Sequence, residues 1–548
     1  MVKVGKVGCY LHGDGLANVI HSDGLANFKH KEYKNKLNIT QPDFPKENQQ
    51  FEVLVSNPPY SIDSFKNSAR EYYREGDFDL YNDLSDSSSQ IECLFIERTK
   101  QLLKYGGVAG IILPISIKSE KNRVVKKARE IILNHFEIIA MVELGKNTFL
   151  ATPQETTIYF LKRRNNYDSI NVKIGVEKLF ANHLEVTLNG VEKPILKYIS
   201  HVWESISFED YISLLKKNPN TNITQHELYK EYQKKLKSKN VKEFWDKVLG
   251  TEKEKLFYFI LTFPQKIVLV KSGEKETEKR FLGYKFSERR SKEGIKSINK
   301  NKSIEESTKL FNENDGLDSR KINFYIKNAF EKQINLDIAE ELSEYVSYNY
   351  LTDLLSFNEV DFDLTLNTSE FKTFSFPSIY KSDYLEFLLD ENFKITSPKI
   401  ESSSVLQEGK FPVITQDKEN LINGHTNLEN PIQNLPLILF GDHSCVFKYV
   451  DFPFFRGADG VVLLSPKKNI HPKYLFYFLD IIIKNNIENY GKYERHFKYL
   501  KRKKIPIPPI DIQNKLVEEI EELVKKSKLI VINDLEKRIE KIIKKYLQ

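Results

Sequence analysis

Apolar residues in the first third of the chain form short runs that alternate with stretches of helical spacing. Phe51 to Val55 is such a run and predicts a buried strand, which Asn57-Pro58-Pro59 ends abruptly because proline cannot continue a central strand. Ile91 to Arg98 predicts a helix that runs on to a stop at Gly106-Gly107. Val108 to Pro114 then predicts a second buried strand.

The same alternation continues with a charged helix and two further strands, predicted at 119–134, Phe136–Leu144 and Thr157–Lys162. Strands that alternate with helices are typical of an α/β layer with a mainly parallel sheet. We therefore predict that residues 1–165 form an α/β domain with a partial Rossmann-like sheet.

The pattern changes twice further along the chain. Residues 166–365 contain Glu- and Lys-rich segments with helical spacing and predict a helical extension, and residues 366–380 predict a linker. Residues 381–511 contain strand-like runs separated by turn residues and predict an α+β domain. Residues 512–548 repeat apolar residues at helical spacing among Glu and Lys, which predicts one long amphipathic helix or coiled-coil arm. The predicted elements of the α+β domain are strands at Gly409–Gln416, Leu437–Ser444 and Gly460–Pro466, and a helix at Pro472–Ile482.

Composition narrows the class of protein without deciding it. The 548 residues suffice for two or three domains, and 40% hydrophobic and 29% charged residues describe an ordinary soluble protein. A net charge of +7 permits nucleic-acid binding but does not demonstrate it. Neither a secretory signal nor a bilayer-spanning run is visible, so we predict a cytoplasmic protein without a membrane partner. Cys9, Cys93 and Cys445 lie far apart, which predicts a reducing compartment and no metal site.

The residues that follow the first strand, Asn57-Pro58-Pro59-Tyr60, carry the candidate chemistry. An exocyclic amine on a base is a poor nucleophile because its lone pair is delocalised into the ring. The Asn57 side-chain oxygen and the Pro58 carbonyl can accept both amino hydrogens and localise that lone pair, while the prolines fix the backbone in advance. Tyr60 can stack on a base swung out of its duplex. The alternative is a plain Pro-Pro turn after a strand.

A strand that ends in Asn-Pro-Pro-aromatic resembles the catalytic motif of amino-group methyltransferases, chiefly DNA adenine-N6 enzymes. The order of helix, Leu102-Leu103-Lys104-Tyr105-Gly106-Gly107, apolar strand and proline is similar to the methylation subunits of Type I restriction–modification systems and to Type IIG enzymes. This resemblance implies S-adenosylmethionine as the cofactor and direct methyl transfer without a metal. It also implies that the catalytic residues are Asn57, Pro58, Pro59 and Tyr60.

The segment before this motif contains a candidate cofactor ligand. In the methylation subunits a Leu-His-Gly helix end leads to a short strand and then to an acidic residue that contacts the adenine of S-adenosylmethionine. Leu11-His12-Gly13, followed by Val19-Ile20-His21-Ser22-Asp23, is similar and implies Asp23 as that ligand. The alternative is that Asp23 is an ordinary turn residue before a glycine. Phe149 and Thr156 resemble the loop that these enzymes bring to the flipped base, or else belong to a core.

The family also places a Gly-rich loop after its first strand, and an acidic residue after its second strand that holds the ribose hydroxyls of the cofactor. Residues 1–9 contain only Gly5 and Gly8, so the resemblance is to a methylase truncated at its N-terminus. Three hypotheses remain open: an active enzyme, an inactive fragment that only binds DNA, and one part of a split enzyme. In the split enzyme a partner, either a second methyltransferase or specificity chain or the missing N-terminal half, supplies the loop.

The order of motifs after residue 400 resembles the target-recognition domain of Type I specificity subunits. The strand Gly409–Gln416, then Gly441-Asp442, Ile505-Pro506-Ile507-Pro508-Pro509 and Gln513 recur together in that family. The resemblance implies double-stranded DNA as a partner and a terminal helix that docks methylation subunits. Asp442-His443-Ser444 is not a hydrolase triad, because adjacent residues do not easily form that geometry.

Residues 493–504 form the densest basic stretch of the chain, with aromatic residues between the cations. Lys and Arg can neutralise phosphates and release counterions, and such contacts position DNA without specifying its sequence. Base reading requires other loops, where Gln416, Lys448 and Arg456 are candidates. The candidate DNA-binding residues are Arg495, Lys498, Lys501, Arg502, Lys503 and Lys504.

These expectations together describe a site-specific DNA adenine-N6 methyltransferase of a restriction–modification system with its own target-recognition domain. A protein-glutamine or RNA methyltransferase is the weaker alternative, because the recognition-like domain argues against it. A metal-dependent nuclease or a translocating motor is not indicated, because the sequence offers neither a convincing acidic cluster with a lysine nor a Walker-type loop.

Overall fold

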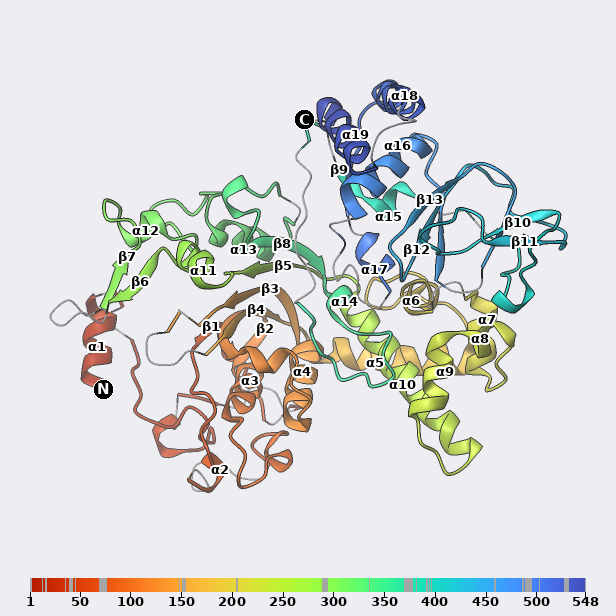
Figure 1. Ribbon diagram of the computed structural model, residues 1–548. Helices are drawn as coiled ribbons and strands as arrows, with labels where there is room; N and C mark the ends of the chain where they lie inside the picture. Colours follow the sequence, from red (N-terminus) through yellow and green to blue (C-terminus); the bar gives the residue numbers. More distant parts are fainter. Residues whose placement is uncertain are drawn as a thin grey trace. The chain divides into compact units, whose positions relative to one another are not determined.

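The computed structural model divides the chain into two compact units, residues 1–368 and residues 369–548 (Figure 1). The structure describes residues 2–11, 13–14, 17–34, 36–38, 43–44, 46–68, 76–146, 148–149, 154–203, 206–287, 294–334, 336–368, 378–380, 382–390, 393, 395, 397–457, 460–484, 487, 495–501, 503–526 and 532–547. Most of the predicted linker 366–380 lies outside these residues.

The first unit contains the helices α1 to α14 and the strands β1 to β8. The helices are α1 (Val2–Leu11), α2 (Phe65–Ser68), α3 (Ile91–Leu102), α4 (Arg123–His135), α5 (Asn166–Asn182), α6 (Pro194–Val202), α7 (Phe208–Leu215), α8 (Thr221–Gln225), α9 (Glu227–Lys235), α10 (Val241–Thr262), α11 (Lys275–Leu282), α12 (Ile304–Ser307), α13 (Ile322–Phe330) and α14 (Leu351–Leu354). The strands are β1 (Phe51–Ser56), β2 (Leu103–Pro114), β3 (Phe136–Leu144), β4 (Thr156–Arg163), β5 (Lys266–Lys271), β6 (Tyr284–Ser287), β7 (Gly294–Ser297) and β8 (Val346–Tyr350).

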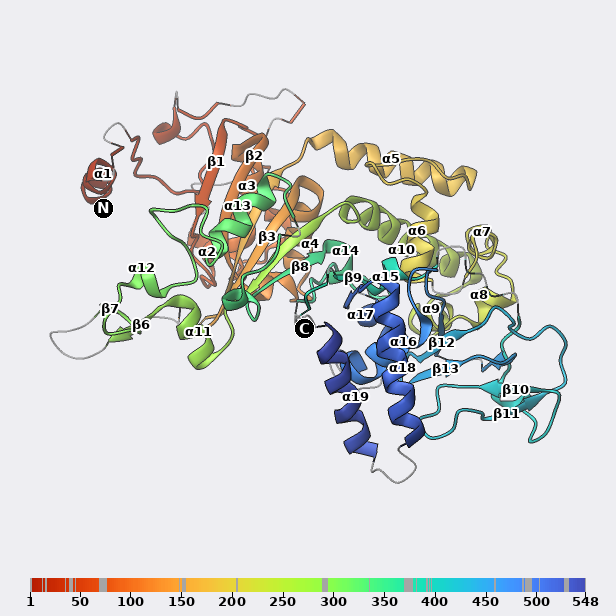
Figure 2. The ribbon, with the colours of Figure 1, turned by 90° about the horizontal axis from the view of Figure 1, so that it is seen from above.

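A six-stranded mixed sheet organises this unit (Figures 1 and 2). Its strand order is β1-β2-β4-β3-β5-β8. The pairs β1/β2 and β3/β5 are parallel, and the other neighbouring pairs are antiparallel. The prediction of a mainly parallel sheet is therefore wrong. The reason is that β4 runs antiparallel between β2 and β3, which sequence periodicity does not reveal because both kinds of pairing bury the same alternate residues.

The first two strands differ from prediction in a way that matters for the site. β1 forms where predicted but is mostly exposed rather than buried, because it is the edge strand of the sheet. Gly106 and Gly107 do not stop a helix; α3 ends at Leu102, and both glycines lie inside β2. Gly106 has a φ of 77°, and a Cβ on Gly107 would lie 3.0 Å from the carbonyl oxygen of Glu52. The register shifts at this point, so the glycine pair forms an irregularity where β2 meets the edge strand.

The two faces of the sheet are covered differently. Figure 1 shows α3 and α4 on one side and α11 and α13 on the other. Ala109, Ile111 and Leu113 of β2 are buried on the α3/α4 side. On the opposite side, α11 and α13 form a core with residues of β3, β5 and β8. The core beneath α11 and α13 therefore contains residues of β3, β4, β5 and β8 but none of β1 or β2.

The segment predicted as a helical extension also contributes strands β5 and β8 to the main sheet. The run Ile267 to Val270 contained the signal for β5, since it is continuously apolar and bounded by lysines. Helices α6 to α10 pack around Glu252, whose side chain is completely buried. Its carboxylate accepts hydrogen bonds from the hydroxyls of Tyr198 (3.0 Å), Tyr211 (2.8 Å) and Tyr232 (2.5 Å) and from the indole N–H of Trp203 (2.9 Å).

The second unit consists of small sheets beside a helical layer. Its elements are β9 (Ser382–Tyr384), α15 (Leu385–Leu388), β10 (Phe411–Ile414), β11 (Gly424–Thr426), β12 (Leu437–Gly441), β13 (Phe447–Val450), β14 (Phe455–Arg456), β15 (Val461–Leu464), α16 (Pro472–Tyr477), the π-helical η6 (Phe478–Ile483), α17 (Phe497–Leu500), β16 (Lys504–Pro506), α18 (Ile510–Lys526) and α19 (Ile532–Leu547). The sheets have the orders β11-β10-β14, β13-β12-β15 and β16-β9. The predicted strands and the helix from Pro472 correspond to β10, β12, β15, α16 and η6.

The prediction of one long terminal helix is wrong, because residues 510–547 contain the two helices α18 and α19 (Figure 1). Lys545 and Tyr546, at the end of α19, each contact the Glu519 carboxylate of α18 at 2.8 Å, so the second helix runs back along the first. Ile520 and Ile543 are buried in the same core as strand β12. Apolar residues keep the same helical spacing through α18 and α19, and the sequence contains no glycine or proline after residue 510. The sequence therefore gave no sign of the break between the two helices.

Candidate functional site

The segment Asn57-Pro58-Pro59-Tyr60 lies at the carboxyl end of β1, an edge of parallel strands at which α/β proteins commonly bind ligands. Pro58 is buried and anchors the segment, while the Asn57 side chain is exposed. The Tyr60 hydroxyl donates a hydrogen bond of 2.5 Å to Oδ1 of Asn57. The first and last residues of the motif are thus hydrogen-bonded to each other. Tyr60 positions the Asn57 side-chain oxygen, which is the atom predicted to accept a hydrogen from the amine.

Glu92 of helix α3 contacts the backbone directly after this segment. The Ser61 N–H donates to Oε2 of Glu92 at 3.2 Å, and Ser61 has a left-handed φ of 48°. Burial raises the pKa of Glu92 above its ordinary value. Burial, with a further contribution from Glu92, also raises the pKa of Tyr60 to about 12. Tyr60 is therefore neutral at physiological pH and acts as a hydrogen-bond donor, not as a base.

Asp23 lies in a tight turn held by hydrogen bonds. Its Oδ1 accepts the Leu25 N–H at 2.8 Å, and its carbonyl accepts the Tyr33 hydroxyl at 2.6 Å. The first of these bonds is the Asx-type contact that characterises a turn residue. Arg98 of α3 donates from Nη2 to the carbonyls of Leu25 (2.7 Å) and Ala26 (3.0 Å). Burial lowers the pKa of Arg98 to about 10, so it remains a cation beside this turn.

One helix therefore positions both candidate parts of the site. Glu92 and Arg98 are six residues apart on α3, roughly 9 Å along the helix axis at 1.5 Å per residue. Sequence reasoning identified the helix but neither of these residues as part of the site. Glu92, Glu97 and Arg98 are all buried on α3, which is rare for charged side chains unless they are paired, and only the structure reveals this burial.

Of the two residues assigned to a base-binding loop, Phe149 is half-buried and Thr156 is fully buried at the start of β4. Residues 147 and 150–153 between them lie outside the described residues. In the described part of the chain, no group of three or more His, Cys, Asp or Glu side chains is arranged to hold a metal ion. Among those residues there is also no helix long and apolar enough to span a bilayer.

S-adenosylmethionine, the cofactor that the motif implies, fits the described residues only in part. Asp23 offers a carboxylate, and Asn57 with Pro58 offers acceptors for the group to be methylated. Among the described residues of the first unit, no strand leads directly into a loop with two glycines, the feature that allows a backbone to approach a nucleotide cofactor closely. The residues present therefore do not complete a site for the whole cofactor.

In the second unit, Arg495 and Phe497 of the predicted basic segment contact the buried carboxylate of Asp442. The Phe497 N–H donates to Oδ1 of Asp442 at 2.6 Å, and the Arg495 guanidinium lies 4.0 Å from Oδ2. Burial raises the pKa of Asp442, although these two partners oppose the shift. The Gly-Asp pair at the end of β12 thus fixes where the basic segment starts.

The six candidate DNA-binding residues differ in exposure. Lys504 is exposed and Lys501 is half-buried, so both ammonium groups can meet a phosphate. Lys503 is only 4% exposed, which leaves little of it accessible to DNA. Arg502 and the Lys498 side chain lie outside the described residues. The geometry thus favours Lys501 and Lys504, with Arg495 partly compensated by Asp442.

Of the three candidate base readers, Lys448 and Gln416 form hydrogen bonds within the unit, and Arg456 is buried. Nζ of Lys448 donates to the carbonyls of Thr415 (2.9 Å) and Asn420 (2.6 Å), and burial lowers the pKa of this lysine. Arg456 is buried, and Oε1 of Gln416 accepts the His443 N–H at 3.1 Å. The Lys448 ammonium group therefore holds two loop carbonyls in place and is not displayed for base edges.

Gln513 has a structural role that its position in the motif order did not reveal. It is 1% exposed, on α18. Its Oε1 accepts the His471 N–H at 2.7 Å, and its Nε2 donates to the carbonyls of Pro508 (2.8 Å) and Asn469 (3.2 Å). This one side chain joins the start of α16 to the proline-rich segment before α18.

Comparison with known families agrees with this division of the chain. Residues 12–149 match the family model of the Eco57I restriction-modification methylase, and residues 381–541 match the model of the Type I restriction modification DNA specificity domain. The chain thus contains a restriction–modification methylase domain, followed by a Type I DNA specificity domain. No curated protein sequence matches the chain.

Solved structures resemble parts of the chain. The Type I restriction enzyme EcoKI M protein is 17% identical over 29% of this chain and 28% of its own length, with a TM-score of 0.22. The HsdS subunit from Thermoanaerobacter tengcongensis is 16% identical over 31% of this chain and 46% of its own length, with a TM-score of 0.22. The type IIG restriction endonuclease BpuSI is 11% identical over 88% of this chain and 49% of its own length, with a TM-score of 0.19. The matched region therefore spans less than half of each of these proteins.

Proposed function

We propose that this chain is the catalytic and target-recognising component of a DNA adenine-N6 methyltransferase of a restriction–modification system. The observation that carries the proposal is the Asn57-Pro58-Pro59-Tyr60 segment at the carboxyl end of β1, in a chain that also contains a Type I specificity domain. The methyl donor is S-adenosylmethionine. The acceptor is the amino group of an adenine turned out of double-stranded DNA, because the motif cannot reach a base inside a stacked duplex.

Asn57 and Pro58 hold the acceptor amine in this proposal. An amide oxygen has two lone pairs, so Oδ1 of Asn57 can accept one amino hydrogen while it keeps the Tyr60 hydroxyl as a second donor. The Pro58 carbonyl accepts the other amino hydrogen, and the two prolines keep that carbonyl in place. The neutral ring of Tyr60 provides a stacking surface for the adenine.

The second unit supplies sequence recognition. Lys501 and Lys504 contact phosphates and position the duplex, with Arg495 as a further, weaker contact. The hydrogen bonds of Lys448 within the unit and the burial of Arg456 support assigning base reading to other residues of the loops. A second candidate function is recognition of DNA without catalysis, and the partial fit to the cofactor is the observation that favours it.

The test is to isolate the full-length chain from its own host with any polypeptide that copurifies, and to incubate it with unmethylated DNA and S-adenosylmethionine. Mass spectrometry of the nucleosides should detect N6-methyladenine. Asn57→Ala should reduce this product about 10²- to 10³-fold, the cost of removing one positioned hydrogen-bonding group, while DNA binding stays unchanged. Asn218→Ala, at an exposed asparagine elsewhere, is the matched control.

N4-methylcytosine as the product would contradict the adenine assignment, and full activity of the Asn57→Ala variant would contradict the assigned site. Absence of any methylated nucleoside, together with salt-dependent DNA binding, would favour recognition without catalysis. Methylation of RNA or protein in place of DNA would favour the weaker alternative.

A further inference from the structure

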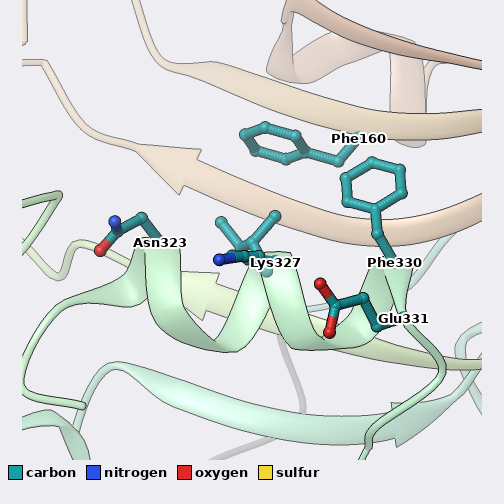
Figure 3. A pocket seen from close by; sticks show the side chains of 6 residues that line it. Phe160, Asn323, Lys327, Phe330 and Glu331 are labelled. Atoms are coloured by element: carbon teal, nitrogen blue, oxygen red, sulfur yellow. The ribbon is translucent and has the colours of Figure 1, made fainter. Parts of the chain in front are cut away.

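The first unit contains a cavity of ≈ 350 Å³ between β4 and α13. Figure 3 shows the rings of Phe160 and Phe330 approaching one another from the strand and the helix at this cavity. Its lining is mainly apolar, so a ligand there would be selected by its shape and apolar surface and not by hydrogen bonds. A more specific arrangement of polar groups occurs in the second unit, around Gln416.

Gln416 lies two residues after β10, and only one end of its side-chain amide is used within the unit. Its Oε1 accepts the His443 N–H at 3.1 Å, and this contact assigns the oxygen and the nitrogen of the amide. Its Nε2 donates to no residue in the described part of the chain. The side chain is half-buried and not fully enclosed, so the Nε2 hydrogens remain available to a partner.

Two glycines leave the space that this amide occupies. A Cβ on Gly460, which has a φ of 62°, would lie 2.7 Å from Nε2 of Gln416. A Cβ on Gly441 would lie 2.8 Å from the Cβ of Gln416 and 2.2 Å from Oγ of Ser444. All three separations are shorter than the contacts that real Cβ atoms make. A larger residue at either glycine would therefore displace the Gln416 side chain.

The backbone next to Gln416 is held by side chains of the same unit. Oδ1 of Asn423 accepts the Thr415 N–H at 2.9 Å. Nζ of Lys448 donates to the carbonyls of Thr415 (2.9 Å) and Asn420 (2.6 Å), one on each side of Gln416. The glutamine is therefore presented by a backbone that is fixed before a ligand arrives, as precise recognition requires. In this arrangement Lys448 is a positioning residue.

The turn that orients Gln416 also holds the basic segment. His443 directly follows Asp442, whose Oδ1 accepts the Phe497 N–H at 2.6 Å and whose Oδ2 lies 4.0 Å from the Arg495 guanidinium. An oriented amide and the start of a basic segment thus meet at the carboxyl end of β12. Phosphate contacts fix the register of a protein on DNA, and nearby side chains then meet the base edges.

We infer that Gln416 is a specificity-determining residue, which reads one adenine of the DNA recognition sequence through the major groove. This adenine stays within the duplex and is a different base from the one proposed to be methylated. The inference rests on the proposed role of the second unit in DNA recognition, and it assigns the reading of one base pair to one residue.

Adenine matches the hydrogen-bonding groups of this amide. In the major groove adenine presents N7 as an acceptor and its N6 amino group as a donor. Nε2 of Gln416 donates to N7, and Oε1 accepts from N6 with its second lone pair while it keeps the His443 N–H on the first. Guanine places the acceptor O6 opposite Oε1 instead of a donor. A pair of this kind gives about 5- to 150-fold discrimination against a wrong base.

The test is to let the full-length chain, isolated from its own host with any polypeptide that copurifies, select duplexes from a pool of random DNA sequences. The wild type should enrich a motif that contains adenine. Gln416→Ala should relax the preference at one adenine about 5- to 150-fold and leave the rest of the motif and the salt dependence unchanged. Gln416→Glu should shift that position towards cytosine, because a carboxylate accepts from the cytosine N4 amino group. Gln433→Glu, at an exposed glutamine before β12, is the matched control.

An unchanged motif for both Gln416 variants would overturn the inference, and so would a wild type that enriches no motif. Relaxed preference at many positions, or weaker binding to all sequences, would show that Gln416 only supports the loops. A change confined to a position other than adenine would overturn the assigned base. Selection does not require methyl transfer, so the two levels fail separately. A motif that depends on Gln416 without any N6-methyladenine keeps the inference and removes the enzyme, whereas methylation at a motif indifferent to Gln416 does the reverse.

Discussion

Glu92 and Arg98 lie six residues apart on helix α3, and each holds one of the two segments that carry the candidate active site. Glu92 accepts the N–H of Ser61, next to the Asn-Pro-Pro-Tyr motif, and Arg98 donates to the carbonyl of Leu25, next to Asp23. The distance between the cofactor side and the acceptor side of the site is therefore set by a rigid helix and not by the loops.

The first prediction concerns Arg98. Its replacement by methionine keeps much of the side chain's packing against the rings of Phe28 and Phe78 but leaves two buried carbonyls without their donor. We expect the first unit to lose about 2–4 kcal/mol of stability, since each unsatisfied buried group costs roughly 1–3 kcal/mol. Hydrogen exchange should show faster opening of residues 23–26 and unchanged exchange in the second unit. Arg123→Met, at an exposed arginine, is the control, and equal effects of the two changes would contradict the assigned role.

A second prediction separates the two contributions of Tyr60. Tyr60→Phe removes the hydroxyl that donates to Asn57 but retains the ring, so we expect the rate of methyl transfer to fall no more than about tenfold, the equivalent of one ordinary hydrogen bond. Tyr60→Ala also removes the stacking surface and should cost a further factor of roughly 10 or more. Single-turnover rates with DNA at saturation measure both effects. Equal rates for the Phe and Ala variants would show that the ring does not contact the base.

The third prediction is a pH dependence that originates in Lys255. This lysine is buried beside Tyr232 and Glu252, and burial lowers its pKa to about 8. Because the unfolded chain binds this proton more tightly than the folded chain, the folded state should gain stability as pH rises from about 8 towards 10.5, the ordinary value.

Lys255→Met removes that proton site, and the four donors to Glu252 from tyrosine and tryptophan side chains remain. The wild type should therefore gain stability between pH 7 and pH 9.5, whereas the unfolding free energy of the variant should change little over the same range. Denaturant unfolding at both pH values measures this, with exposed Lys242→Met as the control. A wild-type stability that falls between pH 7 and pH 9.5 would contradict the sign of the pKa shift.

The fourth prediction concerns Gln513 in the second unit. Gln513→Leu is close to isosteric but leaves the His471 N–H and the carbonyls of Pro508 and Asn469 without this partner. We expect a loss of about 2–4 kcal/mol in the unfolding free energy of this unit. Asn514→Leu, at the exposed neighbouring position, should change it by less than about 1 kcal/mol. Comparable stability of the two variants would show that these hydrogen bonds do not hold α16 to the proline-rich segment.

The fifth prediction concerns DNA binding by the exposed lysine of the basic segment. Lys504→Ala should weaken binding about equally for all DNA sequences and reduce the slope of log affinity against log salt by about 1, because one phosphate contact is lost. Lys468→Ala, at an exposed lysine elsewhere in the unit, should leave the slope unchanged. Fluorescence anisotropy over a range of salt concentrations makes this comparison. A change in sequence preference with an unchanged slope would instead assign Lys504 to base reading.

Local patterns predicted individual strands well where burial on both faces of the sheet gives a continuous run of apolar residues. β3 has the predicted bounds Phe136–Leu144, α3 begins at Ile91 as predicted, and the predicted strand Val108–Pro114 forms the second part of β2. The same reasoning failed for β1, since an apolar run indicates a strand but not whether anything covers it. The same reasoning also predicted α18 and α19 as one helix, because two helices packed on one core repeat the same apolar spacing.

The sequence by itself provided the candidate acceptor residues, Asn57 to Tyr60, and the order of motifs that resembles the specificity domain, because both depend on residue types within short segments. Only the tertiary structure decided that α3 joins Asp23 to this motif, and that Lys503 and Gln513 are buried. It also decided that β1 is an uncovered edge. The physical reason is that burial and hydrogen-bond partners depend on residues far apart in the chain, and local periodicity contains no information about which distant segment packs against a given face.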